Sequence, residues 1–122
     1  VFKTVVNMNK TIEIGLCGPG RHEIKNNNGD EISDFIFEAT IRNPNDFGSH
    51  RKRVMEWLSK NIETKVELKV YLTGLTQCTT SLINAVVLWN MNSHWDKKIL
   101  LTMLHFDRDT GGYKEEQFVT LE

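Results

Sequence analysis

The sequence of 122 residues is poor in cysteine, has no excess of charge of one sign and contains no long apolar run. Its two cysteines, Cys17 and Cys78, are too few for a disulfide scaffold, so we expect free thiols in a reducing cytoplasm. Lys and Arg total 15 and Asp and Glu total 16, so overall charge disfavours binding to long duplex nucleic acid. No apolar run reaches the ~20 residues that a membrane span needs, and no membrane association is expected.

Short motifs for common cofactors are missing as well. The chain has no complete Gly-x-Gly-x-x-Gly for a dinucleotide, and no His-x-x-x-His or Cys-x-x-Cys spacing for a structural zinc site. We therefore expect neither a cofactor nor a bound metal. The composition is that of one globular domain over residues 1–122, in which residues 1–7 are an extension of little weight in the fold.

Segments with the patterns of strands and helices alternate along the chain, which is typical of an α/β layer fold. Residues 65–73 alternate apolar and polar side chains, whereas residues 99–106 form a near-continuous apolar run typical of the interior of a parallel sheet. Strands are also expected at residues 11–17 and, as an antiparallel edge strand, at residues 113–119. The sequence therefore predicts a Rossmann-like, mostly parallel sheet with flanking helices.

Two helices are expected between these strands. One is amphipathic, with apolar residues at helical spacing: Val54, Trp57, Leu58 and Ile62. Asp46 or Ser49 is expected to cap it. The other, residues 76–91, is apolar nearly all round and so requires burial on more than one side. We expect a second copy of the chain to cover it between Ser81 and Met91, giving a homodimer.

An inserted hairpin is expected between the first strand and the first helix. The Asn28-Gly29 pair favours a hairpin turn with both φ values positive. Residues 32–41 then include an alternating stretch, which suggests a second, partly exposed strand.

Glycines and polar residues follow each candidate parallel strand. Ligands of open parallel sheets bind beyond the carboxyl ends of the strands, so these residues should meet at one edge. The predicted ligand-binding residues are Gly18, Gly20, Arg21, Thr73, Gly74, Thr76, Gln77, Thr79 and Arg108. Arginine suits phosphate by its bidentate geometry, and a helix that starts at Thr76 offers free backbone N–H groups to an anion. The alternatives are a tight turn after the first strand and simple helix capping after the second.

His22, Glu23 and His105 are the candidate catalytic residues. Histidine acts as a general base near neutral pH, and a carboxylate orients it or shares its proton. The alternative reading of the last group is that residues 107–112 form an ordinary hairpin turn. Cys78, at the start of a helix, is expected to have some thiolate character.

Residues 70–76 (VYLTGLT), which run into an apolar helix, resemble the strand–Thr-Gly-Gly-Thr-Lys–helix segment of CARF domains, the Rossmann-like sensors of cyclic oligonucleotides in CRISPR systems. The matching residues are Thr73, Gly74 and Thr76. Leu75 stands in place of the second glycine and Gln77 in place of the lysine. The resemblance implies a homodimer with a cyclic oligoadenylate bound across the two subunits, and some members of the family cleave that ligand without a metal.

Three hypotheses follow. In the first, the protein binds a phosphate-bearing nucleotide, such as a cyclic oligonucleotide second messenger, near a homodimer interface, and senses, sequesters or degrades it in CRISPR or phage defence or counter-defence. In the second, it is a metal-independent ring nuclease or phosphohydrolase that uses Arg21, His22, Glu23 and His105. In the third, it is an oligomeric interaction protein with no small-molecule site.

Overall fold

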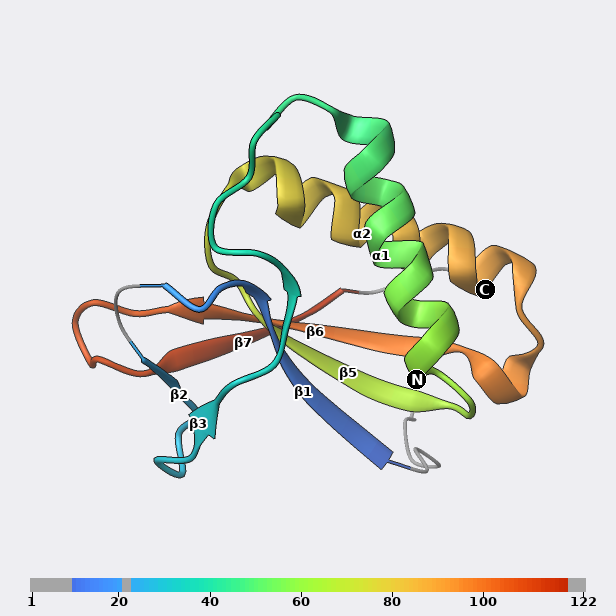
Figure 1. Cartoon of the computed structure of the whole chain (residues 1–122). Helices are drawn as coiled ribbons and strands as arrows, with labels where there is room; N and C mark the ends of the chain where they lie inside the picture. The colour runs from blue at the N-terminus through green and yellow to red at the C-terminus, as the bar shows by residue number, and fades with distance from the viewer. Residues whose placement is uncertain (1–9, 21–22, 119–122) are drawn as a thin grey trace.

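Five strands form one sheet in the order β4-β1-β5-β6-β7 (Figure 1). The computed structural model describes residues 10–20 and 23–118, so the expected extension at residues 1–7 and the predicted strand end at Val119 lie outside the described residues. The strands are β1 (Lys10–Cys17), β4 (Phe35–Phe37), β5 (Val66–Tyr71), β6 (Ile99–Phe106) and β7 (Tyr113–Phe118). β4, β1, β5 and β6 run parallel, and β7 runs antiparallel to β6. The predicted α/β fold with a mostly parallel sheet is confirmed.

Both helices, α1 (Phe47–Asn61) and α2 (Thr76–Asn92), cover the same face of the sheet (Figure 1). The connections from β4 to β5, through α1, and from β5 to β6, through α2, step in the same direction across the sheet, and right-handed crossovers then place both helices on one side. A short 3₁₀ helix, η1 (Trp95–Lys97), follows α2. In the described part of the chain, no helix has the length and apolar character to cross a membrane.

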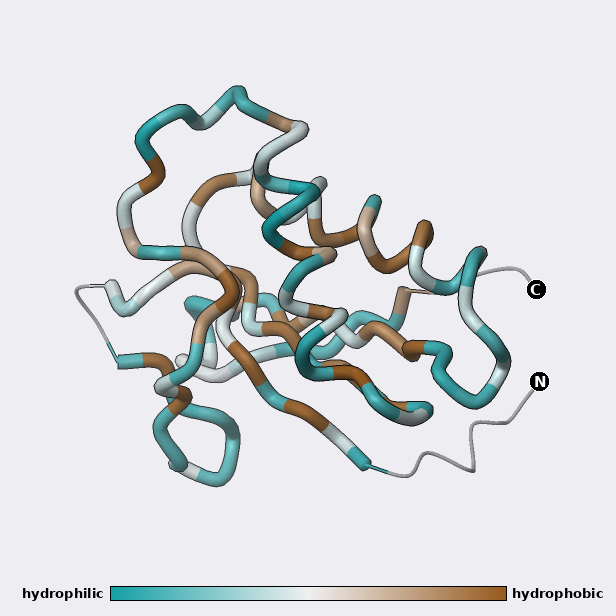
Figure 2. The backbone as a smooth tube through the Cα atoms, turned by 45° about the vertical axis from the view of Figure 1, so that its right-hand side comes forward, coloured by the Kyte–Doolittle hydropathy of each residue, from teal (hydrophilic) through white to brown (hydrophobic). Residues whose placement is uncertain are grey.

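The main core lies between the sheet and the two helices. Val54 and Leu58 of α1 and Leu82 and Val86 of α2 are fully buried there, together with strand residues such as Val70. Burying a side chain of this size contributes roughly 1.5–3 kcal/mol. Figure 2 shows that apolar residues concentrate in the strands and in α2, whereas the loops are mainly hydrophilic.

The start of α1 is fixed by Asp46. Its carboxylate accepts hydrogen bonds from the Ser49 backbone N at 3.3 Å and from the Ser49 hydroxyl at 2.8 Å. Of the two expected caps, Asp46 is therefore the one that the structure uses, and Ser49 is its partner.

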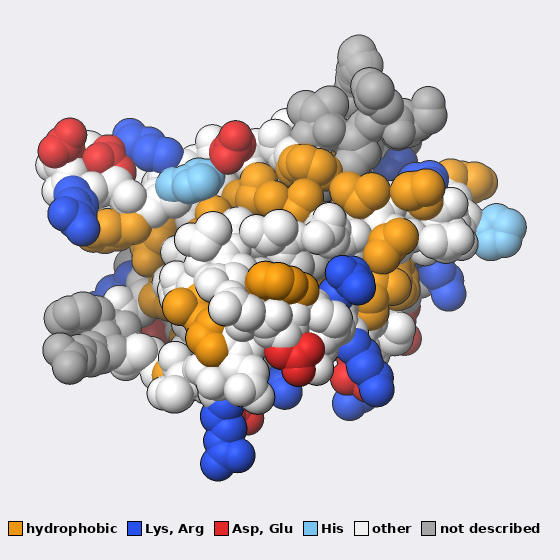
Figure 3. Space-filling view, turned by 90° about the horizontal axis from the view of Figure 1, so that it is seen from above, with side chains coloured by type: hydrophobic (Ala, Val, Ile, Leu, Met, Phe, Trp, Pro, Cys, Tyr) orange, Lys and Arg blue, Asp and Glu red, His pale blue; other side chains and the backbone are white. Residues whose placement is uncertain are grey.

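The apolar circumference of α2 is covered on two sides within one chain. One side faces the sheet, and α1 packs across another (Figure 1). α1 thus covers a second side of α2, for which we expected another subunit. Leu88, Met91 and Trp95 remain 40%, 75% and 73% exposed near the end of α2. Figure 3, which views the helical layer from above, shows apolar side chains gathered in a band on this face.

The predicted inserted hairpin is confirmed, and it lies on the face of the sheet opposite the helices (Figure 1). Its strands are β2 (Ile24–Lys25) and β3 (Glu31–Ile32). Ile24 and Ile32 pack against Tyr71 and Leu104 in a second, small core. The connection from β1 to β4 steps across the sheet in the direction opposite to the helical connections, so the same crossover rule places it on the other face.

The turn of this hairpin is longer than the two-residue turn that Asn28-Gly29 favours. The Asn26 backbone N donates to the Asp30 carbonyl at 2.9 Å. The Asn26 side-chain oxygen accepts from the backbone N of Asn28 at 3.0 Å and of Asp30 at 2.9 Å. One asparagine side chain therefore holds the loop, and Gly29 adopts the positive φ of +87°.

The second strand predicted within residues 32–41 is present as β4, but it is shorter than the alternating stretch of the sequence. Ile32 ends β3 in the hairpin, and β4 extends only over Phe35–Phe37. Phe35 is half-buried, whereas Ile36 and Phe37 are buried. The alternation in the sequence therefore reflects packing against two different layers rather than one long strand.

The sheet face opposite the helices is polar where the hairpin does not cover it. The Tyr71 hydroxyl donates to the Glu13 carboxylate at 2.7 Å, and the Lys69 ammonium lies 2.9 Å from Glu115. Burial, with help from the bond to Glu13, raises the pKa of Tyr71 well above its usual value. This half-exposed polar face explains why β5 alternates polar and apolar side chains, although it is a central strand.

Candidate functional site

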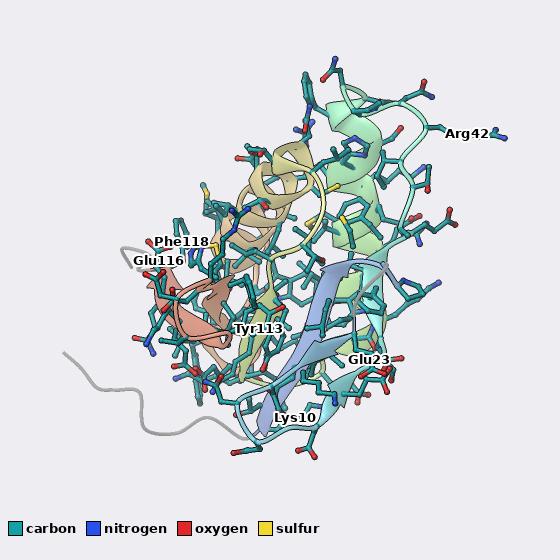
Figure 4. All side chains as sticks on the ribbon, turned by 90° about the vertical axis from the view of Figure 1, so that its left-hand side faces the viewer. Lys10, Glu23, Arg42, Tyr113, Glu116 and Phe118 are labelled. Atoms are coloured by element: carbon teal, nitrogen blue, oxygen red, sulfur yellow. The ribbon has the colours of Figure 1, made fainter. Side chains whose placement is uncertain are left out.

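The carboxyl ends of β1, β4, β5 and β6 lie at one edge of the sheet because these strands are parallel. Figure 4 looks onto this carboxyl edge. Gly18, Pro19 and Gly20 follow β1, and Thr73 and Gly74 follow β5. The topology therefore brings together the first two predicted groups, apart from Arg21, which lies outside the described residues together with His22.

The ends of β1 and β5 are joined by the hydroxyl of Thr73. This hydroxyl accepts a hydrogen bond from the Cys17 backbone N at 3.0 Å and donates one to the Cys17 carbonyl at 2.6 Å. The ladder between the two strands has its last pair at Gly15 and Tyr71. Thr73 thus replaces a backbone partner where the ladder has ended, which gives it a structural role at the edge.

Two of the predicted glycines are required by packing within the chain. Gly74 has φ +80°, and a Cβ there would lie 2.6 Å from the Cβ of Cys17. A Cβ at Gly18 would lie 2.5 Å from the Phe35 ring. Gly20 differs, because nothing lies within 4 Å of its position and it is exposed. Of these three glycines, Gly20 is the one that leaves open surface at the edge.

The first turn of α2 presents unpaired backbone donors at this edge. The residue before the helix, Leu75, makes no side-chain cap, and its carbonyl accepts from the backbone N of Cys78 at 3.0 Å and of Thr79 at 3.4 Å. Across the described residues, the N–H groups of Thr76 and Gln77 meet no hydrogen-bond acceptor. With no acidic residue in this turn, the positive end of the helix is available to an anion.

The side chains of this turn divide between solvent and structure. Thr76 is exposed, and Thr79 is half-buried. Gln77, at the position where the family motif has lysine, donates from its amide to the Asn45 side-chain oxygen at 3.2 Å. Gln77 therefore ties the start of α2 to the loop between β4 and α1.

The third group, after β6, folds as a self-contained turn. The Asp107 carboxylate accepts from the Asp109 backbone N and from the Thr110 hydroxyl, both at 3.0 Å. The Asp107 backbone N donates to the Gly112 carbonyl at 2.8 Å. Residues 107–112 therefore form the ordinary hairpin turn that we considered as the alternative to a catalytic group. Arg108 is exposed on the turn, and its guanidinium has no partner within residues 10–20 and 23–118.

The structure separates the candidate catalytic residues that it describes. His105 Nε2 lies 2.8 Å from a Glu116 carboxylate oxygen on β7. His105 follows Met103 by two positions in β6, so it lies on the same face of the sheet as Met103, the face that the helices cover. Glu23 pairs with Lys25 at 3.5 Å on the hairpin, which covers the other face. In Figure 4, Glu116 lies at the β7 edge and Glu23 lies on the far side of the sheet from it. His105 and Glu23 are therefore not assembled as an acid–base pair.

The two cysteines are buried against each other behind the edge. Burial, more than any other factor, raises the pKa of Cys17 to about 12, and burial also raises the pKa of Cys78. The expected thiolate character of Cys78 is therefore wrong, because loss of solvation outweighs the effect of the helix end.

A pocket of about 540 Å³, which we did not predict from the sequence, lies beside the carboxyl edge, between the β4–α1 loop and the first half of α1. Asp46, Ser49, His50 and Arg53 line it from successive turns of one helix face. His50 is buried, its ring lies edge-on to that of Phe37, and its Nε2 donates to the Pro44 carbonyl at 2.9 Å. The helical spacing of these polar residues is the signal in the sequence from which the shared face could have been predicted.

The carboxyl edge therefore offers unpaired backbone donors, an open glycine and an adjoining pocket. Within the part of the chain that the structure describes, no three His, Cys, Asp or Glu side chains gather closely enough to hold a metal ion. No protein-family model, curated protein or solved structure matches the chain.

Proposed function

We propose that the protein binds a phosphate-bearing nucleotide at the carboxyl edge of its sheet, with a cyclic oligonucleotide as the favoured ligand. The observation that carries the proposal is the pair of backbone N–H groups at Thr76 and Gln77, which meet no acceptor among the described residues and lie at the positive end of α2. Such groups at the end of a parallel sheet suit a phosphate without further charged residues. Gly20, with open space around it, leaves room for the ligand to approach.

Sensing or sequestering this ligand is favoured over cleaving it. Cleavage by the predicted residues needs His105 and Glu23 near one scissile bond, but they belong to opposite faces of the sheet. His105 is engaged with Glu116 instead. The role in defence or counter-defence that the CARF resemblance implies is part of this proposal.

Isothermal titration calorimetry with cyclic di-, tri- and tetranucleotides tests the proposal. We expect micromolar or tighter binding of at least one of them. Chromatography of the ligand after incubation then separates the two roles, because an intact ligand supports sensing or sequestration and a linear product supports cleavage. No heat of binding with any member of the panel would contradict the proposal and favour a pure interaction protein.

We also propose that the protein is a homodimer through the end of α2. Leu88 and Met91, three positions apart on α2, and Trp95 just after the helix are exposed apolar side chains, which we call the apolar patch, and their exposure to solvent is unfavourable. The patch lies at the other end of α2 from Thr76. Each subunit then builds its own ligand site at a distance from this interface, unlike the shared site that the family resemblance implies.

The double variant Leu88→Glu/Met91→Glu should convert the dimer to a monomer, because it places two charges in the apolar interface. Sedimentation equilibrium measures the change in mass. Phe47→Glu is the matched control, since Phe47 is also exposed and apolar (54%) but lies at the start of α1. A wild-type protein that is monomeric at every concentration would overturn the proposal, as would equal dissociation by the control.

A further inference from the structure

The pocket beside α1 adjoins the carboxyl edge. Two hydrogen bonds join them: the Gly18 backbone N donates to the Phe37 carbonyl at 3.1 Å, and the Gln77 amide donates to Asn45 at 3.2 Å. Phe37 itself lines the pocket, and Asn45 belongs to the loop that forms its outer wall. The pocket is an open depression of the surface with a volume of about 540 Å³, which is in the size range of small-molecule sites.

Arg53, an exposed residue of α1 that lines this pocket, is held there by one hydrogen bond. Its Nε donates to the Ile36 carbonyl at 3.0 Å, which anchors the guanidinium at the wall. The rest of its N–H groups have no acceptor in the described ranges, and no carboxylate forms an ion pair with it there. A guanidinium that is anchored on one side and free on the other is suited to a bidentate bond with a phosphate.

The acidic side chains that line the pocket do not occupy the guanidinium of Arg53, which stays available to a phosphate. The Asp46 carboxylate is engaged by Ser49 as the helix cap, and those hydrogen bonds hold its pKa below the usual value. Glu38 lies on the exposed loop. Its carboxylate is an acceptor that suits ribose hydroxyls or base amines rather than phosphate. This combination of one free guanidinium with carboxylate acceptors matches a nucleotide better than a simple anion.

Arg42 does not share the anchored position. Arg42 also lines the pocket, but Figure 4 shows its side chain directed outward, away from the helices. Arg42 therefore provides a control of equal charge on the same pocket.

We propose that Arg53 in this pocket binds a second phosphate group of the nucleotide whose first phosphate lies at the start of α2. The ligand then carries at least two phosphates, as in a cyclic di- or larger oligonucleotide, and a mononucleotide occupies one part of the site only. The inference rests on the proposed function, because it takes the carboxyl edge as the first phosphate site.

The test is calorimetry of the wild type, Arg53→Gln and Arg42→Gln with 5′-AMP and with cyclic di-, tri- and tetra-adenylate. Loss of a hydrogen bond to a charged group corresponds to a fall in affinity of about 10- to 100-fold, and we expect this for Arg53→Gln with the tightest cyclic ligand. Arg42→Gln should stay within about threefold of the wild type, since the Arg42 side chain is directed outward and lacks the hydrogen bond that anchors Arg53. Arg53→Lys, which keeps the charge, should recover part of the loss, and thermal melts check that each variant is folded.

The outcomes separate this inference from the proposed function. If the wild type binds a cyclic ligand and Arg53→Gln binds it equally well, the pocket is not a phosphate site and the inference is overturned while the proposed function stands. Equal affinity of the wild type for 5′-AMP and the cyclic ligands also overturns it. If the wild type binds none of these ligands, the proposed function itself fails.

Discussion

Replacing Gly74 with alanine should lower the free energy of unfolding by about 2–5 kcal/mol. Two costs combine at this position. A φ of +80° disfavours any residue with a Cβ by about 1–2 kcal/mol. The new Cβ would also lie 2.6 Å from the Cβ and 2.7 Å from the sulfur of Cys17, which forces the end of β1 away from β5. Urea denaturation followed by circular dichroism measures the loss.

Gly111→Ala separates these two costs. Gly111 has a similar φ of +76°, but nothing lies within 4 Å of its position, so only the backbone cost applies. We expect it to lose about 1–2 kcal/mol. Equal losses in the two variants would show that the contact between Gly74 and Cys17 does not constrain the edge.

Thr73→Val should cost about 2–4 kcal/mol, although the side chain keeps its shape. Valine cannot replace the two hydrogen bonds that the Thr73 hydroxyl makes to the backbone N and carbonyl of Cys17. Both backbone groups lie at a buried residue and would be left without partners. The measurement is again the free energy of unfolding in urea.

Thr73→Ser is the matched control, because serine keeps the hydroxyl. It should stay within about 1 kcal/mol of the wild type, since only a methyl group is lost. A Thr73→Val variant as stable as Thr73→Ser would mean that water satisfies Cys17 and that Thr73 does not hold β1 to β5.

Local patterns in the sequence were sufficient to predict most of the fold. The apolar run of β6 and the alternation of β5 extend over nearly the full length of each strand, so the predicted boundaries are close to those observed. The strand expected within residues 32–41 is shorter than its alternation suggests, because β3 and β4 are adjacent in sequence but pack in different layers. Which layer a short segment joins depends on contacts with distant residues, which periodicity does not report.

The sequence predicts which residues of the candidate site lie at the carboxyl edge, because that depends on topology alone, but it does not predict the contacts between them. Parallel strands bring Gly18 and Thr73 to one edge, and this follows from the order of elements. The link between Thr73 and Cys17 spans 56 positions and depends on exact register, so no local pattern reveals it. The separation of His105 from Glu23 likewise depends on the face to which the hairpin folds.

The central claim is that free backbone donors at the start of α2 bind the ligand's phosphate, and Thr76→Pro tests it most directly. Proline at the first helical position removes the N–H of Thr76 without breaking a helical hydrogen bond. Leu75, with φ −80° and ψ 142°, already has the extended conformation that a residue before proline prefers. The helix should therefore stay intact.

The measurement is the affinity of Thr76→Pro, relative to Thr76→Ala, for the cyclic oligonucleotide that the wild type binds most tightly. Thr76→Ala keeps the backbone donor and should bind within about threefold of the wild type, whereas Thr76→Pro should bind about 10- to 100-fold more weakly. Equal affinities of the two variants would contradict the claim that this backbone group holds the phosphate.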